Sequence, residues 1–244
     1  MLTHTKSSRT KKVTSLEDID DFIATYGVSS ETISELELKK LAEPKSDTGL
    51  LDFVLDDCGV KYSTDYEIVL SGANIVSYKI REQTIAVANN AFYSEKGSPL
   101  ESLYLPNTII CIGDDSFRNC DKLSNVSFPE SLLRIGNCSF FWCLKLVDIH
   151  LNKRLKYIGT YAFGCSSINS IQIPKSVERI GSHAFSNCNN LEEVIFEGIP
   201  KELGSGIFDG CKNLKGVVVP YGTKQHFEKE LFPINSTLIK ELHK

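Results

Sequence analysis

A unit of about 23 residues is repeated along more than half of this sequence, which limits the chain to folds built from stacked copies of one unit. Each copy contains an aliphatic residue, then a glycine, and a phenylalanine four residues after the glycine. The glycines are 23, 23, 22 and 23 residues apart, and the phenylalanines keep the same steps. The two columns are Gly113, Gly136, Gly159, Gly181 and Gly204, then Phe117, Phe140, Phe163, Phe185 and Phe208.

Further columns keep this period. They are a cysteine column of Cys120, Cys143, Cys165, Cys188 and Cys211, an aliphatic column of Leu123, Leu146, Ile168, Leu191 and Leu214, and two strand columns of Val126, Ile149, Ile171, Val194, Val217 and Phe128, Leu151, Ile173, Phe196, Val219. An earlier copy spans 84–106, with Ala88 in the glycine place and Phe92 in the aromatic place. The columns predict six units, from 84–106 through 199–220, and a partial unit before them.

Each unit contains a short stretch that alternates apolar and polar residues, as a strand with one buried face does. Examples are Val126-Ser127-Phe128, Ile149-His150-Leu151 and Ile171-Gln172-Ile173. One such strand cannot bury its inner face alone, so stacked units must place their strands side by side, ~4.8 Å apart, in a parallel sheet. The phenylalanines then pack inside the coil. The glycines mark a place where a side chain would clash or where a positive φ is needed.

The periodic cysteines have a structural interpretation and two chemical ones. Buried thiols behave as small apolar groups, so we expect a ladder of free cysteines in the core. A metal site or a redox function remains an alternative, but zinc sites use short paired spacings, and no Cys-x-x-Cys occurs. Neighbouring thiols in a stacked column would also mispair in an oxidising compartment. Cys58, Cys111 and Cys138 lie outside the column.

The repeat resembles the BspA-like leucine-rich-repeat family over about residues 84–220. The pattern L-x-x-I-x-I-P-x-S-V-x-x-I-G-x-x-A-F-x-x-C is clearest from Ile168 to Cys188, which reads INSIQIPKSVERIGSHAFSNC. The resemblance implies a leucine-rich-repeat solenoid, a right-handed β-α/β superhelix with a parallel sheet on its concave face. It also implies an adhesive or protein-binding function. The segment from Val219 to Lys224, followed by a predicted helix over 225–231, resembles the closing part of such arrays, so 221–244 is interpreted as a C-terminal cap.

The residues before the repeat differ from it in charge. Residues 1–14 carry four basic residues and no acidic one, residues 15–58 carry twelve acidic residues and three lysines, and the remainder is nearly neutral. We interpret 1–14 as a disordered basic tail and 15–83 as an acidic lead-in with a small, mainly α-helical N-terminal cap. Helices are predicted over 15–27, 29–43 and 49–58, and a strand pair over 66–70 and 74–80. A separate docking module is the alternative, and the acidic charge argues against a DNA-binding helix-turn-helix.

Motifs for catalysis are missing from the sequence. There is no glycine-rich phosphate loop, no G-x-S-x-G and no H-E-x-x-H. The five histidines are scattered, and we expect His183 to be solvated. We therefore predict no enzyme activity, no cofactor and no metal. An enzyme with its site in the N-terminal region is kept as a remote alternative.

The outward strand positions are the candidate binding residues, because side chains that alternate with the buried ones form two rows across the sheet. The candidates are Tyr104, Ser127, His150, Gln172 and Ile195 in one row, and Asn125, Asp148 and Glu193 in the other. Their variety is typical of a recognition surface, although the same residues fit a merely solvated sheet. Few lysines or arginines lie among them, which favours a protein or peptide ligand over nucleic acid.

Three functional classes follow from this interpretation. The preferred one is a protein-protein interaction module that binds through the concave face, and a homo-oligomer is compatible with it. The alternatives are a cell-surface adhesin and a purely structural spacer. The sequence as written has no apolar run of the ~18 residues that a membrane span needs, and no signal peptide. It is therefore expected to be cytoplasmic, with a surface or secreted location if a signal was removed.

Overall fold

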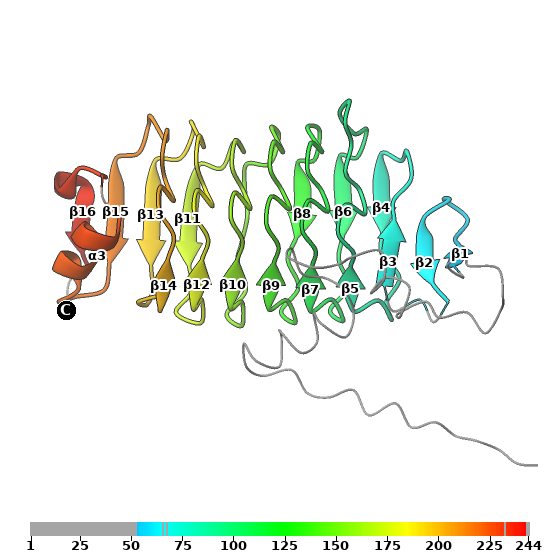
Figure 1. Ribbon diagram of the computed structural model, residues 1–244, viewed down its shortest axis with the longest axis horizontal. Coiled ribbons are helices and arrows are strands. Elements are labelled where there is room, and N and C mark those ends of the chain that lie inside the picture. The colour runs from blue at the N-terminus through cyan, green and yellow to red at the C-terminus, as the bar shows by residue number, and fades with distance from the viewer. Residues whose placement is uncertain (1–52, 65, 67, 232, 243–244) are drawn as a thin grey trace, which may run out of the picture.

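The computed structural model describes residues 53–64, 66, 68–231 and 233–242. These residues form coils that are stacked side by side in one row, with the C-terminal helix at one end (Figure 1). Strands of successive coils lie next to one another, as the predicted solenoid requires. The predicted stacking of repeat units is therefore confirmed.

Three sheets run along the row of coils. The nine-stranded sheet contains β1 (Phe53–Leu55), β2 (Lys61–Ser63), β3 (Ile68–Ser71), β5 (Ala86–Val87), β7 (Cys111–Ile112), β9 (Arg134–Ile135), β10 (Tyr157–Ile158), β12 (Arg179–Ile180) and β14 (Glu202–Leu203). A three-stranded sheet contains β4 (Ser77–Lys79), β6 (Ser102–Tyr104) and β8 (Asn125–Ser127). A four-stranded sheet contains β11 (Ser170–Ile173), β13 (Glu193–Phe196), β15 (Gly216–Val219) and β16 (Ile239–Glu241).

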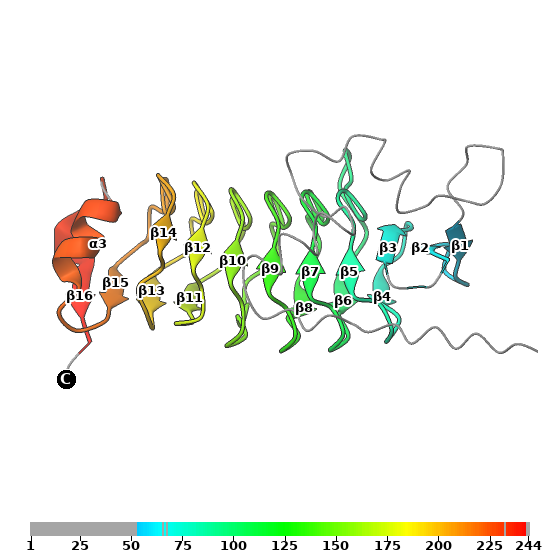
Figure 2. The same ribbon diagram turned by 60° about the horizontal axis from the view of Figure 1, so that its bottom comes forward.

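Most units contribute two strands, where the sequence pattern predicted one. The second strand is the two-residue stretch directly before the glycine column, for example Cys111–Ile112, which joins the nine-stranded sheet. Figure 2 shows its strands as a separate row from those of the two smaller sheets. So short a stretch has no detectable alternation, so the pattern did not predict it. The strand predicted at Ile149-His150-Leu151 was wrong, because no strand is assigned there, although Ile149 is buried.

The phenylalanine column forms a continuous stack of rings inside the coils. Successive ring centroids from Phe92 to Phe208 lie 5.1, 5.2, 5.4, 5.4 and 5.8 Å apart, and their planes differ by at most 19°. The rings are almost fully buried. Because every coil presents its ring to the ring of the next coil, each addition buries apolar area on both sides.

The glycine column exists because successive backbones touch there. A Cβ built on Gly159 would lie 2.4 Å from the carbonyl carbon of Gly136, and one on Gly181 would lie 2.3 Å from the amide nitrogen of Thr160. None of the five column glycines has a positive φ. Of the two predicted reasons for this column, the structure therefore supports the clash. Ala88 occupies the same place in the first unit, where no complete unit precedes it.

The cysteine column is a ladder of free thiols, as predicted, but one of its five members was assigned wrongly. Cys165 has a φ of 60° and lies on the outer turn, and Ser166 is buried in the core place instead. The reason is that this coil has one residue fewer than its neighbours between Ser166 and Ile168. The remaining thiols each donate to the carbonyl oxygen of the phenylalanine in the preceding coil. The pairs are Cys120–Phe92 at 3.4 Å, Cys143–Phe117 at 3.3 Å, Cys188–Phe163 at 3.2 Å and Cys211–Phe185 at 3.1 Å.

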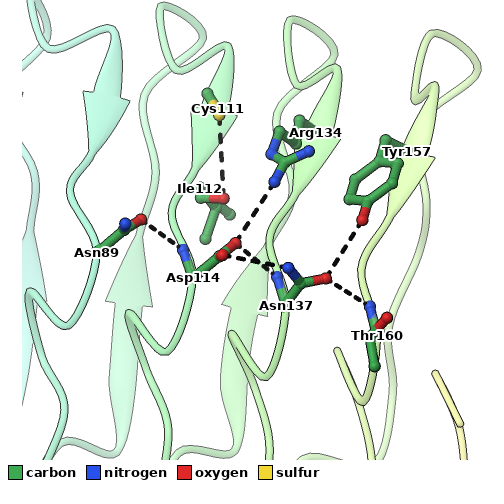
Figure 3. A network of polar contacts seen from close by, with 8 residues as sticks. All are labelled: Asn89, Cys111, Ile112, Asp114, Arg134, Asn137, Tyr157 and Thr160. Carbon is green, nitrogen blue, oxygen red and sulfur yellow. Dashed lines mark hydrogen bonds and ion pairs between the residues drawn. The ribbon is translucent and has the colours of Figure 1, made fainter. Parts of the chain in front are cut away.

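A polar ladder runs beside the glycines (Figure 3). The side-chain oxygens of Asn89, Asp114 and Asn137 each accept the backbone N–H at the same place in the next coil, at 2.8 Å in all three cases. Asp114 is buried and also lies 3.5 Å from the guanidinium of Arg134. These bonds satisfy backbone groups that the two-residue strands leave unpaired at the turn.

Both ends of the described chain close the stack. At the N-terminal side β1, β2 and β3 are antiparallel, and the helix predicted over 49–58 is contradicted by β1 (Phe53–Leu55). The other helices predicted in the lead-in lie outside the described residues. Both strands predicted over 66–70 and 74–80 are present, as β3 and β4, but the predicted pairing is wrong, because β3 pairs with β2 and β5 whereas β4 pairs with β6 in another sheet.

At the C-terminal side α3 (Lys224–Glu230) corresponds to the predicted helix. The ring centroid of its buried Phe227 lies 4.7 Å from that of Phe196. The short 3-10 helix η1 (Ser236–Leu238) leads into β16. β16 extends the four-stranded sheet as a parallel neighbour of β15. This end of the core is therefore covered by the helix and by an extra strand.

Replacing Gly159 by alanine tests the backbone contact between coils. The new Cβ would meet main-chain atoms that cannot rotate away, so we expect the free energy of unfolding to fall by about 2 kcal/mol or more. Gly216 is the matched control, because the nearest atom to a Cβ there is 4.0 Å away. Urea denaturation should show little change for Gly216→Ala. Equal stability of both variants would contradict the explanation.

Glu178 gives a pH-dependent test of the outer face of the nine-stranded sheet. Its carboxylate accepts from Lys156 at 2.8 Å and from Lys201 at 2.5 Å, and these bonds lower the pKa of Glu178. A lowered carboxylate pKa stabilises the fold above the unfolded pKa, and this contribution is lost as the pH falls through the folded pKa. Glu178→Gln should cost roughly 0.5–1 kcal/mol at pH 7 and progressively less below about pH 4. Denaturant melts across this range would show a constant difference if the carboxylate charge were irrelevant.

Candidate binding face of the strand array

The candidate side chains lie in register on neighbouring strands wherever strands are assigned. Ser102 is opposite Asn125 and Tyr104 is opposite Ser127 in the three-stranded sheet. In the four-stranded sheet, Glu193 is paired with Ser170 and with Gly216, and Ile195 is paired with Gln172 and with Val218. The two rows predicted from alternation are therefore present. The candidates are exposed, apart from the half-buried Ile195.

A shallow hollow of about 560 Å³ lies over β4, β6 and β8. Its floor and walls include four of the eight candidates, namely Tyr104, Asn125, Ser127 and Asp148. The remaining polar lining consists of Ser77, Lys79, Ser102, Ser124 and Lys145. The hollow therefore combines hydroxyl, amide and charged groups with one exposed aromatic ring.

Tyr104 is the exposed aromatic residue in the lining of this hollow. Its side chain is 47% exposed, and the ammonium of Lys79 lies 4.8 Å from the centroid of its ring. Lys79 is also paired with Glu82 at 2.9 Å, which raises the pKa of the lysine, so it stays charged. A cation over an exposed aromatic face offers a ligand one charged and one apolar contact within a few ångströms.

The strand row is interrupted beside the hollow. No strand is assigned at Asp148 and His150, which separates the three-stranded from the four-stranded sheet, and both side chains are exposed. Beyond the interruption, Gln172 donates to the carboxylate of Glu197, so its amide is already engaged. The structure therefore brings the first four candidates into one concavity. It leaves His150 on the coil without a strand, and Gln172, Glu193 and Ile195 on the four-stranded sheet.

Sequence reasoning missed an aromatic ridge on the turns that follow the glycine column. The ring of Tyr161 stacks on His183 at 4.8 Å and packs edge-on against Phe141 at 5.7 Å. His183, which we expected to be solvated, is only 31% exposed and lies 3.6 Å from Asp209, so the expectation holds in part. Trp142, the only tryptophan of the chain, is 50% exposed at this ridge. The ridge positions vary from unit to unit, so no column marked them.

The described part of the chain offers few groups for metal binding or thiol chemistry. There, no group of three or more His, Cys, Asp or Glu side chains is placed to hold a metal ion. Burial raises the pKa of the Cys120 thiol to about 12 and that of Cys143 well above its usual value, which keeps these thiols protonated. The helices within the described ranges are all too short or too polar to cross a bilayer.

Comparison with known families and structures agrees with this geometry. The family described as "BspA type Leucine rich repeat region" matches residues 85–215 in six copies. This chain belongs to that family. The six copies agree with the six units predicted from the sequence. No curated protein matches the chain.

Solved structures show the same fold at low sequence identity. A leucine-rich repeat protein from Bacteroides ovatus is 23% identical with a TM-score of 0.57, over 82% of this chain and 53% of its own. The T. pallidum leucine-rich repeat protein TpLRR is 23% identical with a TM-score of 0.57, over 78% of this chain and 97% of its own. The pneumococcal vaccine antigen PcpA is 19% identical with a TM-score of 0.56, over 81% of this chain and 49% of its own. The BspA-type chain thus spans about half the length of two of these proteins.

Proposed function

We propose that this chain is a binding module that recognises a protein or peptide through the sheet face, centred on the hollow at Tyr104. The observation that carries the proposal is the hollow itself, which gathers four varied, solvent-exposed side chains on otherwise repetitive coils. Its role is recognition without a chemical step. The interior side chains of the repeat pack against one another and are not available to a ligand. Specificity therefore has to come from positions that differ between units.

The dimensions of the face suit a folded partner or an extended segment. The row from β4 to β15 contains seven coils, one of them without an assigned strand. At ~4.8 Å spacing it is ~29 Å wide, which is comparable to one side of a standard protein interface. Tyr104 supplies the kind of exposed aromatic anchor that dominates binding energy in such interfaces. The hydroxyl and amide groups around it supply hydrogen bonds for orientation.

Electrostatics favours a protein ligand over nucleic acid. The hollow contains two lysines and one aspartate, and the four-stranded sheet adds Glu193 on its outward side. Nucleic-acid binding would need several basic side chains aligned to meet phosphates. A segment carrying an acidic group for Lys79 or Lys145 beside an apolar group for Tyr104 fits this arrangement better.

The proposal predicts that Tyr104→Ala/His150→Ala/Glu193→Ala weakens capture of a specific partner. Proteins retained by the immobilised full chain would be quantified by mass spectrometry, and the affinity of the retained partner measured by titration. We expect the triple variant to bind at least about tenfold more weakly, since truncating an aromatic anchor costs ~2 kcal/mol.

The matched control replaces the same residue types away from this face. Tyr221, His226 and Glu228 lie on the C-terminal segment and helix α3, at the end of the row. Tyr221→Ala/His226→Ala/Glu228→Ala should retain the partner at wild-type affinity. If both triple variants bind equally, the sheet face is a spacer or the site lies elsewhere. A single Asp148→Lys substitution then tests the hollow without removing the aromatic ring.

A surface location is the second proposal, and with it an adhesin-like role. It is favoured by the structural likeness to a pneumococcal protein named as a vaccine antigen. The alternative remains the cytoplasm. Protease added to intact source cells would degrade a surface protein and spare an internal one, so the two locations give opposite results.

A further inference from the structure

The outward side of the nine-stranded sheet changes character along the row. In register, the outward residues of successive strands are Ala86, Cys111, Arg134, Tyr157, Arg179 and Glu202. From Arg134 onward they are polar or charged and interact along the row. Arg134 lies 4.3 Å from the ring centroid of Tyr157, and Arg179 pairs with Glu202 at 2.9 Å. Arg134 is itself buried. Tyr157 and Arg179 are partly exposed and Glu202 is exposed, so this face opens to water from Tyr157 onward.

The first half of the same face is apolar. Its buried members form a cluster separate from the interior core, namely Ile68, Ala86, Ala88, Cys111 and Leu133, with Leu70 and Ile110 packed against them. Alternation places them on the outer side, because Val69, Val87 and Ile112, which are their chain neighbours, belong to the interior core. We call this cluster the outer patch.

The place of Leu133 shows how unusual the outer patch is. The corresponding residues in the following coils are Lys156, Glu178 and Lys201, which form a chain of ion pairs. The strands of these coils are paired in the same register, so strand pairing does not require leucine here. Nevertheless, Leu133 is only 3% exposed, and Ala86 and Cys111 are fully buried.

No second layer covers this sheet within the described residues. Their helices, α3 and η1, belong to the C-terminal closing segment, which lies at the far end of the row from β3 and β5 (Figure 1). An apolar patch that is buried on an outer sheet face needs a covering segment, since such area is otherwise left in water.

The sequence offers one segment with matching chemistry and position. Residues 15–52 enter the fold at Phe53, the first residue of β1, which is the edge strand of this very sheet. The pattern over 15–27 predicts one apolar helix face, made of Leu16, Ile19, Phe22, Ile23 and Tyr26. The remaining positions are acidic or polar, as on a helix that covers an apolar surface.

The lengths are compatible. From β3 to β9 the patch spans three strand spacings, ~14 Å. A helix of 12 residues is ~18 Å long. The residues between this helix and Phe53 are numerous enough to return along the sheet edge.

We propose that residues 15–52 of this chain dock on the outer patch and make it a two-layered part of the fold. The segment then packs on a different sheet from the one that carries the proposed binding face. Its apolar residues contact Leu133 and Cys111, and its acidic residues face the solvent.

Alkylation of Cys111 in the full chain tests this docking. N-ethylmaleimide labelling under native conditions, mapped by mass spectrometry, should modify the exposed Cys58 quickly and Cys111 slowly. Phe22→Asp/Ile23→Asp should raise the Cys111 rate about tenfold or more by opening the layer. Asp20→Asn/Asp21→Asn is the matched control on the polar side and should leave the rate unchanged. Slow labelling of the core thiols Cys120 and Cys143 reports that the solenoid stays folded.

A second variant changes the outer patch instead of the segment that is proposed to cover it. Leu133→Gln should accelerate tryptic cleavage after Lys39, Lys40 and Lys45, whereas Lys156→Gln, at the same place in the next coil, should not. The proposal is overturned if Cys111 in the wild type reacts as fast as Cys58, or if Phe22→Asp/Ile23→Asp leaves it protected. Protection that disappears on dilution would also overturn it, because a second copy of the chain would then be the cover.

Discussion

The distance between successive coils is set where their backbones meet at the glycine column, and the rest of the fold follows from it. With no side chain between Gly136 and Gly159, the two turns approach to van der Waals contact. That approach brings the phenylalanine rings to just over 5 Å and places each core thiol within reach of a carbonyl oxygen one coil back. It also lets Asp114 reach the backbone N–H of Asn137. One steric constraint thus determines aromatic stacking, thiol hydrogen bonds and the polar ladder together.

Different residues therefore provide the stability of the fold and the recognition of a ligand. Residues of the interior columns are interchangeable between coils because each sees the same neighbours, so they carry no information about a ligand. Residues that can distinguish one ligand from another lie on three surfaces that vary from unit to unit. These are the sheet face with its hollow, the aromatic ridge around Trp142, and the outer side of the nine-stranded sheet. On the sheet face, exposed side chains and a concavity coincide.

The sequence predicted the periodic part of the structure because a column of residues records an identical environment several times. The column argument failed where one coil is a residue shorter than the others. Cys165 keeps the spacing to Ile168 and so was placed in the column. The missing residue lies between Ser166 and Ile168, so Ser166 occupies the core position instead. The column argument also failed for elements too short to alternate, such as Arg134–Ile135, and for Ile149-His150-Leu151, where alternation persists without strand hydrogen bonds. The hollow was not predictable, because the columns record which side chains are buried and not where the exposed side chains leave a concavity. Its candidate residues were found only as members of two rows.

The two halves of the outer sheet show that repeat geometry alone does not determine surface composition. Leu133 and Lys156 occupy the same place on adjacent coils with paired neighbouring strands, yet one is buried in an apolar cluster and the other is held in an ion pair. A difference that local backbone structure does not require has to reflect what each residue faces. Charged residues joined along the row are stable in water without a partner, whereas leucine, isoleucine and a thiol gain free energy only when water is excluded. The change between Leu133 and Lys156 therefore marks the boundary between a covered and an uncovered part of this sheet.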